Sequence, residues 1–413
     1  MNNGSPKIAI IGAGAAGMFA AALLGDADMD VTVFERNSND GRKLAITGKG
    51  RCNLTNNCTP EEYLENVPTN PRFMRGAINR FTPQDTMDFF ESAGVPLKTE
   101  RGNRVFPESD SAYDIVDALK KRMGSQPIRE RVESIYGENG RITGLSAGGR
   151  KYDFDIVLLC TGGKSYPKTG STGDGYKFAA SLGHNIVEPE PSLVPLVCDK
   201  KICAPMQGLS LRNVELTLLE IGGKRVFSEF GELLFTHFGM SGPLVLSASA
   251  HMKRGKKYRF EIDLKPALDR ETIDKRVQSD FRKYINKDFA NSLSDLLPKS
   301  MIPVAVAVSG ITGSKKVNAV TKEERRRFVD LLKAFPIEIY GFRPIDEAII
   351  TSGGVDVSQI DPKTMESRLV KGLYFAGEVI DVDCYTGGFN LQTAFSTAYS
   401  AARAIINKLG VRS

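Results

Sequence analysis

The chain has 413 residues, of which 55 are Lys or Arg and 49 are Asp or Glu, for a net charge of +6. This length exceeds the roughly 250–300 residues at which a single core stops growing, so two or three domains are expected. No apolar run reaches the ~20 residues that span a bilayer, the N-terminus is unlike a signal peptide, and the six Cys follow no secreted-scaffold pattern. We therefore expect neither a membrane-spanning protein nor a small protein stabilised by disulfides, and we favour a cytoplasmic location.

The net charge is mild, and we expect it to be spread along the chain. The densest basic runs, residues 253–257 and 325–327, are interpreted as solvated faces. A small-molecule substrate is the expected partner, a membrane is not, and nucleic acid is disfavoured. The oligomeric state stays open.

The N-terminal residues predict a strand, a turn and a helix in close succession. Residues 7–11 form an apolar run typical of a buried parallel strand, and it breaks into Gly-x-Gly-x-x-Gly. An Ala- and Leu-rich helix over 18–24 is expected to end at Gly25. A second apolar run, 31–34, ends in Glu35. This acid can accept hydrogen bonds from a ribose diol, and its charge argues against a 2′-phosphate there.

Each glycine of this motif has a physical role in dinucleotide binding. Gly12 permits the tight turn, Gly14 lets the backbone approach a pyrophosphate, and Gly17 lets the helix pack close to the strand. Ala15 and Ala16, between the glycines, are also expected to bind the cofactor, and the helix N-terminus offers free N–H groups and a partial positive charge to phosphate. Strand, helix and acid agree in spacing, so the sequence predicts dinucleotide binding.

Residues 36–56 are rich in Gly, Thr, Asn and basic side chains and are expected to form a long ordered loop along the cofactor. The motifs at 41–43 (Gly-Arg-Lys) and 47–56 (Thr-Gly-Lys-Gly-Arg-Cys-Asn-Leu-Thr-Asn) resemble the HI0933-like NAD(P)/FAD-dependent oxidoreductases. That family includes aminoacetone oxidase-like and bile-acid dehydroreductase-like flavoproteins. The resemblance covers essentially the whole chain and implies FAD as the tightly bound cofactor. The cofactor-binding residues expected here are Arg36, Lys43, Gly50, Arg51, Cys52 and Asn53.

Cys52 and Cys58 lie where flavin disulfide reductases keep their redox pair, but with a C-x5-C spacing. Those enzymes place a shorter spacing on a helix, and residues 53–57 do not favour one. A redox disulfide therefore remains the less favoured reading. The favoured reading is a packed Cys52 beside the cofactor and an incidental Cys58.

Residues 155–163 predict another buried strand, ending in Cys160-Thr161-Gly162-Gly163. This ending is similar to the Ala-Thr-Gly-Gly motif of two-dinucleotide flavoproteins, which adds the last three of these residues to the cofactor-binding set. The loop 164–175 is rich in small polar residues and is a candidate to bind phosphate or substrate. A second Gly-x-Gly-x-x-Gly unit is absent from the sequence, so a separate NAD(P)H domain is not expected.

Residues 372–381 predict the closing strand and resemble the terminal FAD motif of this superfamily, with Gly377 beside the cofactor. Many relatives have Asp where this chain has Glu378, and Asp381 follows three residues later. Which acid meets the ribityl hydroxyls stays open. A long helix follows, and its positive end would stabilise the anionic reduced flavin. The residues expected to contact the cofactor at its start are Gly388, Asn390 and Leu391.

Between these halves the pattern changes, which predicts an inserted unit. Strand-like runs 214–221 and 224–230 meet at Gly222-Gly223, a strong hairpin signal, whereas 267–335 is mainly helical. We expect an α/β fold with a discontinuous Rossmann-type FAD domain around an insertion. The FAD domain spans 1–192 and 345–413, a β-barrel-like domain 193–266 and 336–344, and a helical subdomain 267–335.

No residue stands out as a general acid, so three side chains are carried as catalytic candidates. Arg104 lies on a predicted hairpin over 97–107, which is either near the active site or a surface feature. Tyr166 lies in the polar loop. His237 stands in an apolar stretch, where a structural role is the commoner one. No metal site is expected, because no second His or acidic cluster accompanies His237.

The sequence therefore predicts an FAD-dependent oxidoreductase. Hydride would pass from NAD(P)H, as a transient co-substrate, through flavin N5 to a small organic acceptor with an activated C=C or C=O, or to oxygen. One alternative is an FAD oxidase of a small amine or amino ketone without nicotinamide. A more distant alternative is a flavin-bound protein that associates with RNA or regulates another process.

Overall fold

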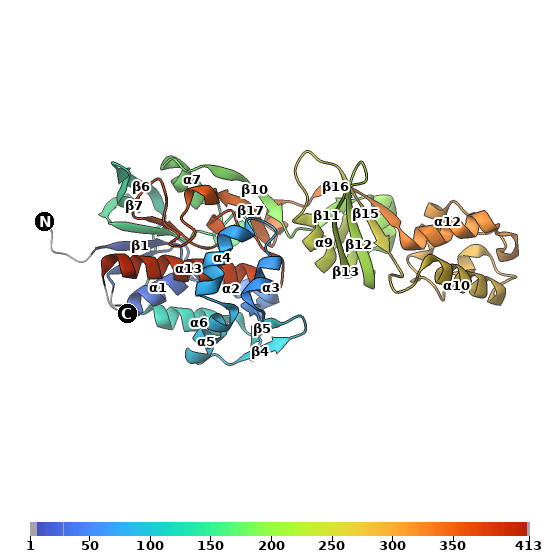
Figure 1. The fold of residues 1–413 in the computed structure, drawn as a ribbon, viewed down its shortest axis with the longest axis horizontal. Coiled ribbons are helices and arrows are strands. Elements are labelled where there is room, and N and C mark those ends of the chain that lie inside the picture. Colours follow the sequence, from blue (N-terminus) through green and yellow to red (C-terminus); the bar gives the residue numbers. More distant parts are fainter. Residues whose placement is uncertain (1–5, 28, 411–413) are drawn as a thin grey trace. The chain divides into compact units, whose positions relative to one another are not determined.

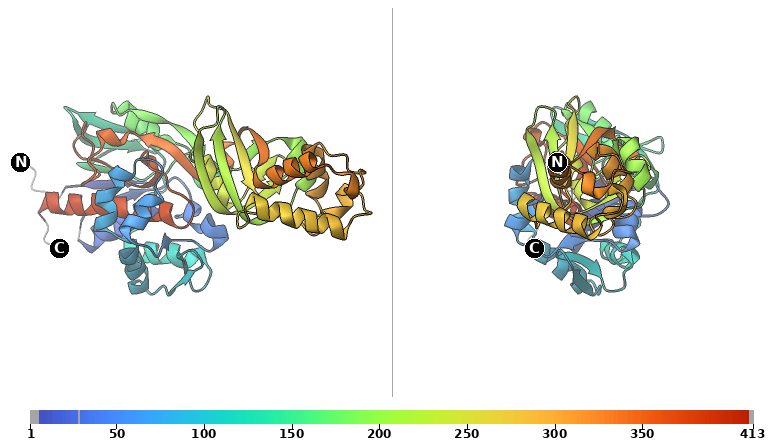
Figure 2. Two further views of the ribbon diagram at one scale, coloured as in Figure 1. Left: turned by 45° about the vertical axis from the view of Figure 1, so that its right-hand side comes forward. Right: turned by 90° about the vertical axis from the view of Figure 1, so that its right-hand side faces the viewer.

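The computed structural model describes residues 6–27 and 29–410. The chain folds into two compact units that divide between Ser192 and Leu193 and between Pro344 and Ile345. We call the unit built from both ends of the chain the terminal unit, and the other the inserted unit. The elements of each can be followed in Figures 1 and 2.

A four-stranded parallel sheet forms the centre of the terminal unit, with strand order β18-β9-β1-β2. Its strands are short and apolar, as suits a sheet covered on both faces. This confirms the Rossmann-type α/β fold. The strands are β1 (Ile8–Ile11), β2 (Val31–Phe34), β9 (Ile156–Leu159) and β18 (Leu373–Phe375).

Three helices pack together beside this sheet: α1 (Ala15–Asp26) contacts both α6 (Ala112–Met123) and α13 (Phe389–Leu409). The prediction that Gly25 ends the first helix is wrong, because α1 continues through it to Asp26. Gly25 is exposed, and a Cβ there would meet its nearest neighbour only at 3.8 Å. The low helix propensity of glycine at this position is therefore outweighed by the packing of the opposite, buried face of α1.

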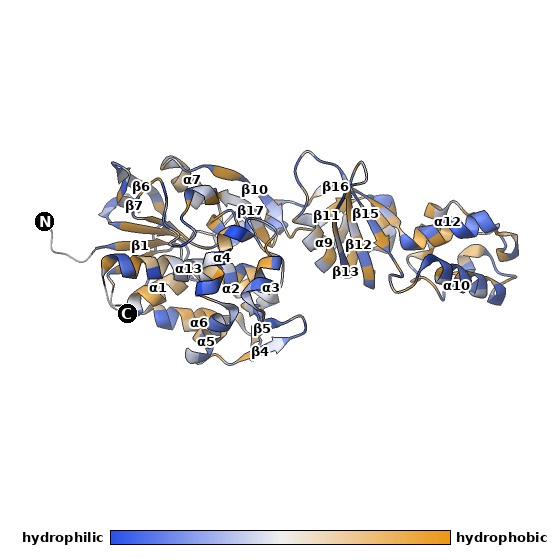
Figure 3. Ribbon diagram, in the orientation of Figure 1, coloured by the Kyte–Doolittle hydropathy of each residue, from blue (hydrophilic) through white to orange (hydrophobic). Residues whose placement is uncertain are grey.

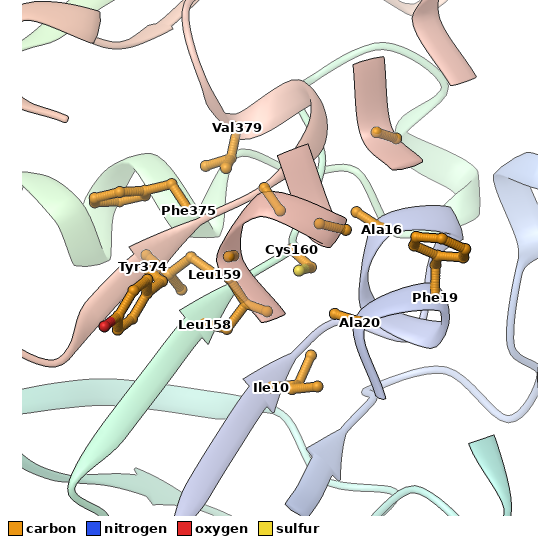
Figure 4. Close-up of a cluster of buried hydrophobic side chains, with 14 of the residues drawn as sticks. Ile10, Ala16, Phe19, Ala20, Leu158, Leu159, Cys160, Tyr374, Phe375 and Val379 are labelled. Atoms are coloured by element: carbon orange, nitrogen blue, oxygen red, sulfur yellow. The ribbon is translucent and has the colours of Figure 1, made fainter. Parts of the chain in front are cut away.

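The core of the terminal unit lies where these strands meet α1, as the close-up in Figure 4 shows. Ile10, Leu158 and Phe375 come from three neighbouring strands and are fully buried. Phe19 of α1 is also fully buried, and its ring lies 5.2 Å from that of Phe395 on α13. This packing holds the first turn of α1 against the carboxyl ends of the strands.

An antiparallel sheet with two tight turns contacts the parallel sheet through β9. Phe34 at the end of β2 meets the rings of Tyr152 and Phe154 at 5.4 and 5.9 Å. The strands of this second sheet are β6 (Val132–Glu138), β7 (Arg141–Ala147) and β8 (Arg150–Asp153).

The rest of the terminal unit contains the predicted hairpin over 97–107, which is confirmed. The expected long loop after Glu35 is partly wrong, because α2 (Arg42–Ile46) interrupts it. The remaining strands are β3 (Thr55–Asn56), β4 (Leu97–Glu100), β5 (Arg104–Pro107), and the antiparallel pair β10 (Ile186–Ser192) and β17 (Ile350–Val355). The remaining helices are α3 (Pro60–Glu65), α4 (Pro71–Arg80), α5 (Pro83–Ser92) and α7 (Asp174–Ser181).

The inserted unit contains a closed barrel with strand order β11-β14-β13-β12-β15-β16. The hairpin predicted at Gly222-Gly223 joins β12 to β13. The barrel strands are β11 (Leu196–Cys198), β12 (Ser210–Glu220), β13 (Arg225–Thr236), β14 (Gly239–Ser241), β15 (Tyr258–Asp263) and β16 (Phe335–Phe342). Its helices are α8 (Lys200–Cys203), α9 (Pro243–Ser249), α10 (Arg270–Lys283), α11 (Ile302–Ser309) and α12 (Lys322–Lys333).

Helices α10 and α12 pack against each other and mix polar and apolar residues along their length (Figure 3). Charge is distributed unequally between the units. Residues 193–344 contain 26 Lys and Arg against 17 Asp and Glu, whereas the rest of the chain contains 29 against 32. The expectation that the positive charge is spread along the chain is therefore wrong at the level of the units. Within the described residues, no helix is both long and apolar enough to cross a membrane.

Candidate functional site

A cavity opens at the carboxyl ends of the parallel strands in the terminal unit. It encloses about 1320 Å³ of space free of protein atoms, counting its open mouth. Gly12, Glu35, Cys160 and Ala376, which each follow one of the four strands, all line it. Ligands of open α/β sheets bind in such a crevice.

The glycines of the first turn lie where a side chain would either collide with the backbone or enter the cavity. Gly12 has φ +104°, and a Cβ there would lie 2.6 Å from the carbonyl oxygen of Cys160. A Cβ at Gly17 would collide with the carbonyl oxygen of Gly12, so helix and strand can approach this closely only without one. A Cβ at Gly14 would meet nothing within 4 Å, and Gly14 lines the cavity. The space in front of Gly14 is thus open to a ligand.

The N-terminus of α1 offers donors to an anion at this place. Gly14 is the N-cap and provides no side-chain acceptor, and the first turn contains no acid. The N–H groups of Ala15 and Ala16 therefore begin a helix whose first turn is uncapped, and both residues line the cavity. An uncapped helix start with a partial positive charge suits a phosphate.

Glu35 is buried beside this turn, with its carboxylate in contact with the backbone. Oε2 accepts a hydrogen bond from the Ala13 N–H at 3.0 Å, and Oε1 accepts from the Asn37 N–H and Nδ2, both at 2.7 Å. Arg36 points away to the start of α7, where Nη1 donates to Asp174 at 3.2 Å and to Thr172 at 3.0 Å. Both residues line the cavity, but the charge of Arg36 is matched by Asp174.

A second polar cluster lies at the ends of β18 and β17. Glu378 Oε2 accepts from Lys43 Nζ at 2.6 Å, while Oε1 accepts from Ser165 Oγ and the Thr351 N–H, each at 2.9 Å. Glu378 and Lys43 line the cavity, and their side chains are 11% and 23% exposed. Asp381 is absent from the lining within the described residues; its Oδ2 accepts from Asn70 Nδ2 at 3.0 Å. Of the two candidate acids, the cavity therefore presents Glu378.

Burial raises the pKa of Asp381 above its ordinary value. It also raises the pKa of the neighbouring Asp383, which is fully buried. Asp383 accepts hydrogen bonds from Ser192 Oγ at 2.7 Å and from Ser352 Oγ at 2.9 Å. These hydroxyls come from β10 and β17, so Asp383 ties both strands to the loop before α13.

The start of α13 forms another part of the cavity wall, through Asn390 and Leu391. Gly388 is the N-cap, with φ +99°, and a Cβ there would collide with the carbonyl of Thr55. Asn53 lies beside this turn, and the orientation of its amide that satisfies both ends has the nitrogen donating to the carbonyls of Thr55 (3.0 Å) and Val105 (3.2 Å). In that orientation the oxygen accepts from the Gly388 N–H at 3.0 Å. Residues 53–55 thus fix the position of the start of α13.

Of the motif over 47–56, Thr47 lines the cavity, and the residues that follow it support the site from outside the lining. Arg51 pairs with Glu100 and Asp110, and its guanidinium carbon lies 4.2 Å above the ring centroid of Phe106. Cys52 is fully buried, and burial raises its pKa to about 12. All six cysteines are free thiols, and burial raises the pKa of Cys58 to about 11.

The structure separates the predicted cofactor residues into two groups. The residues that line the cavity are Gly12, Gly14, Ala15, Ala16, Glu35, Arg36, Lys43, Thr161, Gly162, Gly377, Glu378, Asn390 and Leu391. Those of the described chain that stand outside the lining are Gly17, Gly50, Arg51, Cys52, Asn53, Gly163, Asp381 and Gly388.

The three catalytic candidates are not brought together in the lining. Arg104 is exposed, with Nε donating to the Arg101 carbonyl at 3.0 Å. Tyr166 lies near the cavity, since Lys43 Nζ is 5.8 Å from its ring centroid. His237 is an exposed residue of the inserted unit, with its ring 5.1 Å from that of Phe238. Among the described residues no group of three or more His, Cys, Asp or Glu is placed to hold a metal.

Sequence reasoning missed two residues that orient Glu378. Ser165 lies in the polar loop that was a candidate ligand loop, so its composition was a usable signal. No local sequence pattern pointed to Thr351. Its Oγ1 accepts from the N–H groups of Lys164 and Ser165, at 2.8 and 3.0 Å, which fixes that loop against β17.

The cavity has donors and open space that suit FAD. The open space at Gly14 and the uncapped start of α1 suit a diphosphate.

Comparisons with known proteins agree with this reading. A family model described as the HI0933-like protein Rossmann domain matches residues 6–404. The chain is 32% identical to a 3-dehydro-bile acid delta(4,6)-reductase of Clostridium scindens, covering 96% of this chain and 98% of that one. It is 33% identical to a ribosomal RNA dihydrouridine synthase of Escherichia coli, covering 96% and 97%.

A solved structure, the 3-ketosteroid delta1-dehydrogenase of Sterolibacterium denitrificans, has a similar fold. The TM-score is 0.50 at 13% identity, over 98% of this chain and 100% of that one.

Proposed function

This chain belongs to the HI0933-like family of FAD-dependent oxidoreductases, and from that premise we propose that it reduces a carbon–carbon double bond conjugated to a carbonyl, with NAD(P)H as electron donor. The observation that carries the proposal is the cavity, which joins an uncapped helix start to the Lys43–Glu378 pair. Bound FAD would supply the ring that accepts a hydride and passes it on.

Different lining residues would bind different parts of FAD. The N–H groups of Ala15 and Ala16 would bind the diphosphate, and Glu35 would accept hydrogen bonds from the ribose diol. Glu378 would accept from the ribityl hydroxyls, and Lys43, Ser165 and Thr351 hold its carboxylate in place. The start of α13 would direct its positive end toward the flavin.

The acceptor class is inferred from what two relatives have in common. One is named for reducing double bonds of a 3-dehydro-bile acid, and another is named for making dihydrouridine in ribosomal RNA. Both names describe adding hydrogen to a double bond conjugated to a carbonyl. We propose the same bond type for this chain, in a steroid-like enone or in the uracil ring of RNA.

The first test is the visible spectrum of the purified protein, followed by addition of NADH and of NADPH without oxygen. We expect a flavin spectrum that one of the two bleaches, and that a 3-oxo-4-ene steroid or a uridine-containing RNA restores. Peroxide formed from an amine without nicotinamide would instead favour the oxidase. A protein without flavin, even after incubation with FAD, would overturn the proposal.

The variant Gly14→Val tests whether FAD binds at the start of α1. The new side chain enters the open space in front of α1, so we expect a folded protein with the thermal stability of the apoprotein and without flavin absorbance. Bleaching activity that survives in this variant would show that the cofactor is bound elsewhere.

A further inference from the structure

Five of the nine surplus positive charges of the inserted unit lie at one end of its helices. Helices α10 and α12 run antiparallel, because Arg325 pairs with Asp274 and Asp330 pairs with Arg270. The C-terminal end of α10 therefore lies beside the N-terminal end of α12 (Figures 1 and 2). We call residues 282–299 and 315–326 the basic end.

Backbone contacts join the two segments of the basic end. The Phe289 N–H donates to the Lys315 carbonyl at 2.8 Å, and the Val317 N–H donates to the Lys287 carbonyl at 3.1 Å. An ion pair of 2.8 Å between Lys316 and Asp288 reinforces this junction. The two segments are thus one surface despite their separation in the sequence.

The basic end contains nine Lys and Arg against four Asp and Glu. Three of the acids are already matched: Asp288 by Lys316, Asp295 by Lys283, and Glu324 by Lys315. Five exposed cations have no carboxylate within ion-pair distance among residues 6–27 and 29–410. These are Arg282, Lys287, Lys299, Lys322 and Arg326.

An aromatic ring lies between the cations of this surface. The ring centroid of Tyr284 is 4.9 Å from Lys283 Nζ and 4.2 Å from Lys287 Nζ. Lys283 is paired with Asp295, so Lys287 is the unmatched cation at this ring. Cations and aromatic rings on one surface are the features that bind single-stranded nucleic acid, through phosphate contacts and base stacking.

We propose that the basic end docks the phosphate backbone of a uridine-containing RNA substrate. This inference rests on the proposed function, and it selects RNA over a free enone as the substrate. Unmatched cations add little binding free energy for a small neutral acceptor. When the same cations bind a polyanion, counterions are released, which favours binding. The Coulomb attraction also raises the rate of encounter.

Binding of a fluorescein-labelled RNA hairpin with a uridine-containing loop tests this, using the FAD-loaded enzyme and fluorescence anisotropy over a range of salt. The test variant is Arg282→Ala/Lys287→Ala/Lys322→Ala/Arg326→Ala. We expect a loss of affinity of at least about tenfold at low salt. The slope of log Kd against log salt should fall by about 3, at roughly 0.7 per lost phosphate contact.

The matched control removes four exposed cations without a carboxylate partner from the described part of the terminal unit, Arg72→Ala/Arg75→Ala/Lys121→Ala/Lys363→Ala. It should bind the hairpin within about twofold of wild type. Both variants should keep the flavin spectrum and the melting temperature of wild type, which separates loss of docking from loss of fold.

Three results would overturn the inference: no RNA binding by wild type at low salt, equal losses in both quadruple variants, or binding to anionic lipid vesicles but not to RNA. Failure of the proposed function is distinguishable, because it shows as a flavin that neither nicotinamide bleaches. Reduction of a steroid enone without RNA binding would leave the proposed function standing and remove this inference alone.

Discussion

The terminal and inserted units differ in their charged side chains: carboxylates are buried around the cavity of the terminal unit, whereas the surplus of cations belongs to the inserted unit. In the terminal unit, Glu35, Glu378 and Asp383 lie buried or nearly so, and backbone N–H or hydroxyl groups satisfy each of them. In the inserted unit, cations such as Arg282 and Lys322 stand exposed. Buried carboxylates hold loops in one arrangement around a cavity, whereas exposed cations leave a surface on which a partner can dock. The comparison predicts different responses to substitution in the two units.

Gly17→Ala should have the largest effect. Its Cβ would collide with the Gly12 carbonyl, which belongs to a backbone turn that cannot move without the sheet. We expect the free energy of unfolding to fall by about 3 kcal/mol or more, with loss of flavin absorbance. Denaturant unfolding measures this. Gly25→Ala in the same helix is the control and should be neutral or stabilising by up to about 1 kcal/mol.

Phe260→Ala tests whether the terminal unit binds FAD independently of the stability of the inserted unit. Phe260 is fully buried in β15 of the barrel, so its removal should cost about 3–5 kcal/mol. Because the described lining of the cavity comes from the terminal unit alone, the flavin spectrum should persist. Tyr340→Ala, at a side chain 66% exposed, should cost less than about 0.5 kcal/mol. Loss of FAD in Phe260→Ala would show that the units depend on each other.

Lys43→Met should leave the Glu378 carboxylate without its cation in a mostly buried place. We expect a loss of about 2–3 kcal/mol in stability and weaker FAD binding, measured by unfolding and by flavin titration. Lys43→Met/Glu378→Gln should cost less than the sum of the single changes, since both act on one interaction. Lys177→Met, at a pair of 3.7 Å whose Lys is 75% exposed, should cost less than about 0.5 kcal/mol.

Asp383→Asn should have the smallest effect, confined to the pH dependence of stability. Burial raises the pKa of Asp383 in the folded state above its unfolded value of 3.8. The folded state therefore binds this proton more tightly, and stability falls as pH rises from 3.8 through the raised pKa. Asp383→Asn should remove that fall, as seen in melting temperatures over an acid pH series.

Asp356 supplies a control with the opposite sign. The Ser358 N–H donates to its carboxylate at 2.9 Å, and this bond lowers the pKa of Asp356. Its contribution to stability is present above the unfolded value of 3.8 and is lost as pH falls through the lowered pKa. Asp356→Asn should therefore shift the pH slope in the opposite direction to Asp383→Asn, and equal shifts would contradict both assignments.

The sequence by itself determined the features that depend on neighbouring residues. The spacing of Gly12, Gly14 and Gly17 after an apolar strand defines the turn, because the close approach of Gly17 to Gly12 lies within one strand–turn–helix unit. The hairpins at 97–107 and at Gly222-Gly223 were predictable for the same reason. Gly25 was not, since packing of α1 on α6 and α13 outweighs its low helix propensity. The close approach of Gly12 to Cys160, which follows β9, was set by the fold.

Tertiary structure alone decided the contacts between distant segments. Asn53 lies beside Gly388 although more than three hundred residues separate them along the chain, and Thr351 orients Glu378 without any local motif. The choice of Glu378 over Asp381 in the lining also needed the fold, because the two acids stand three residues apart on one turn of chain. Hydrogen bonds and charge neighbourhoods depend on three-dimensional distance, and local sequence patterns report only the distances along the chain.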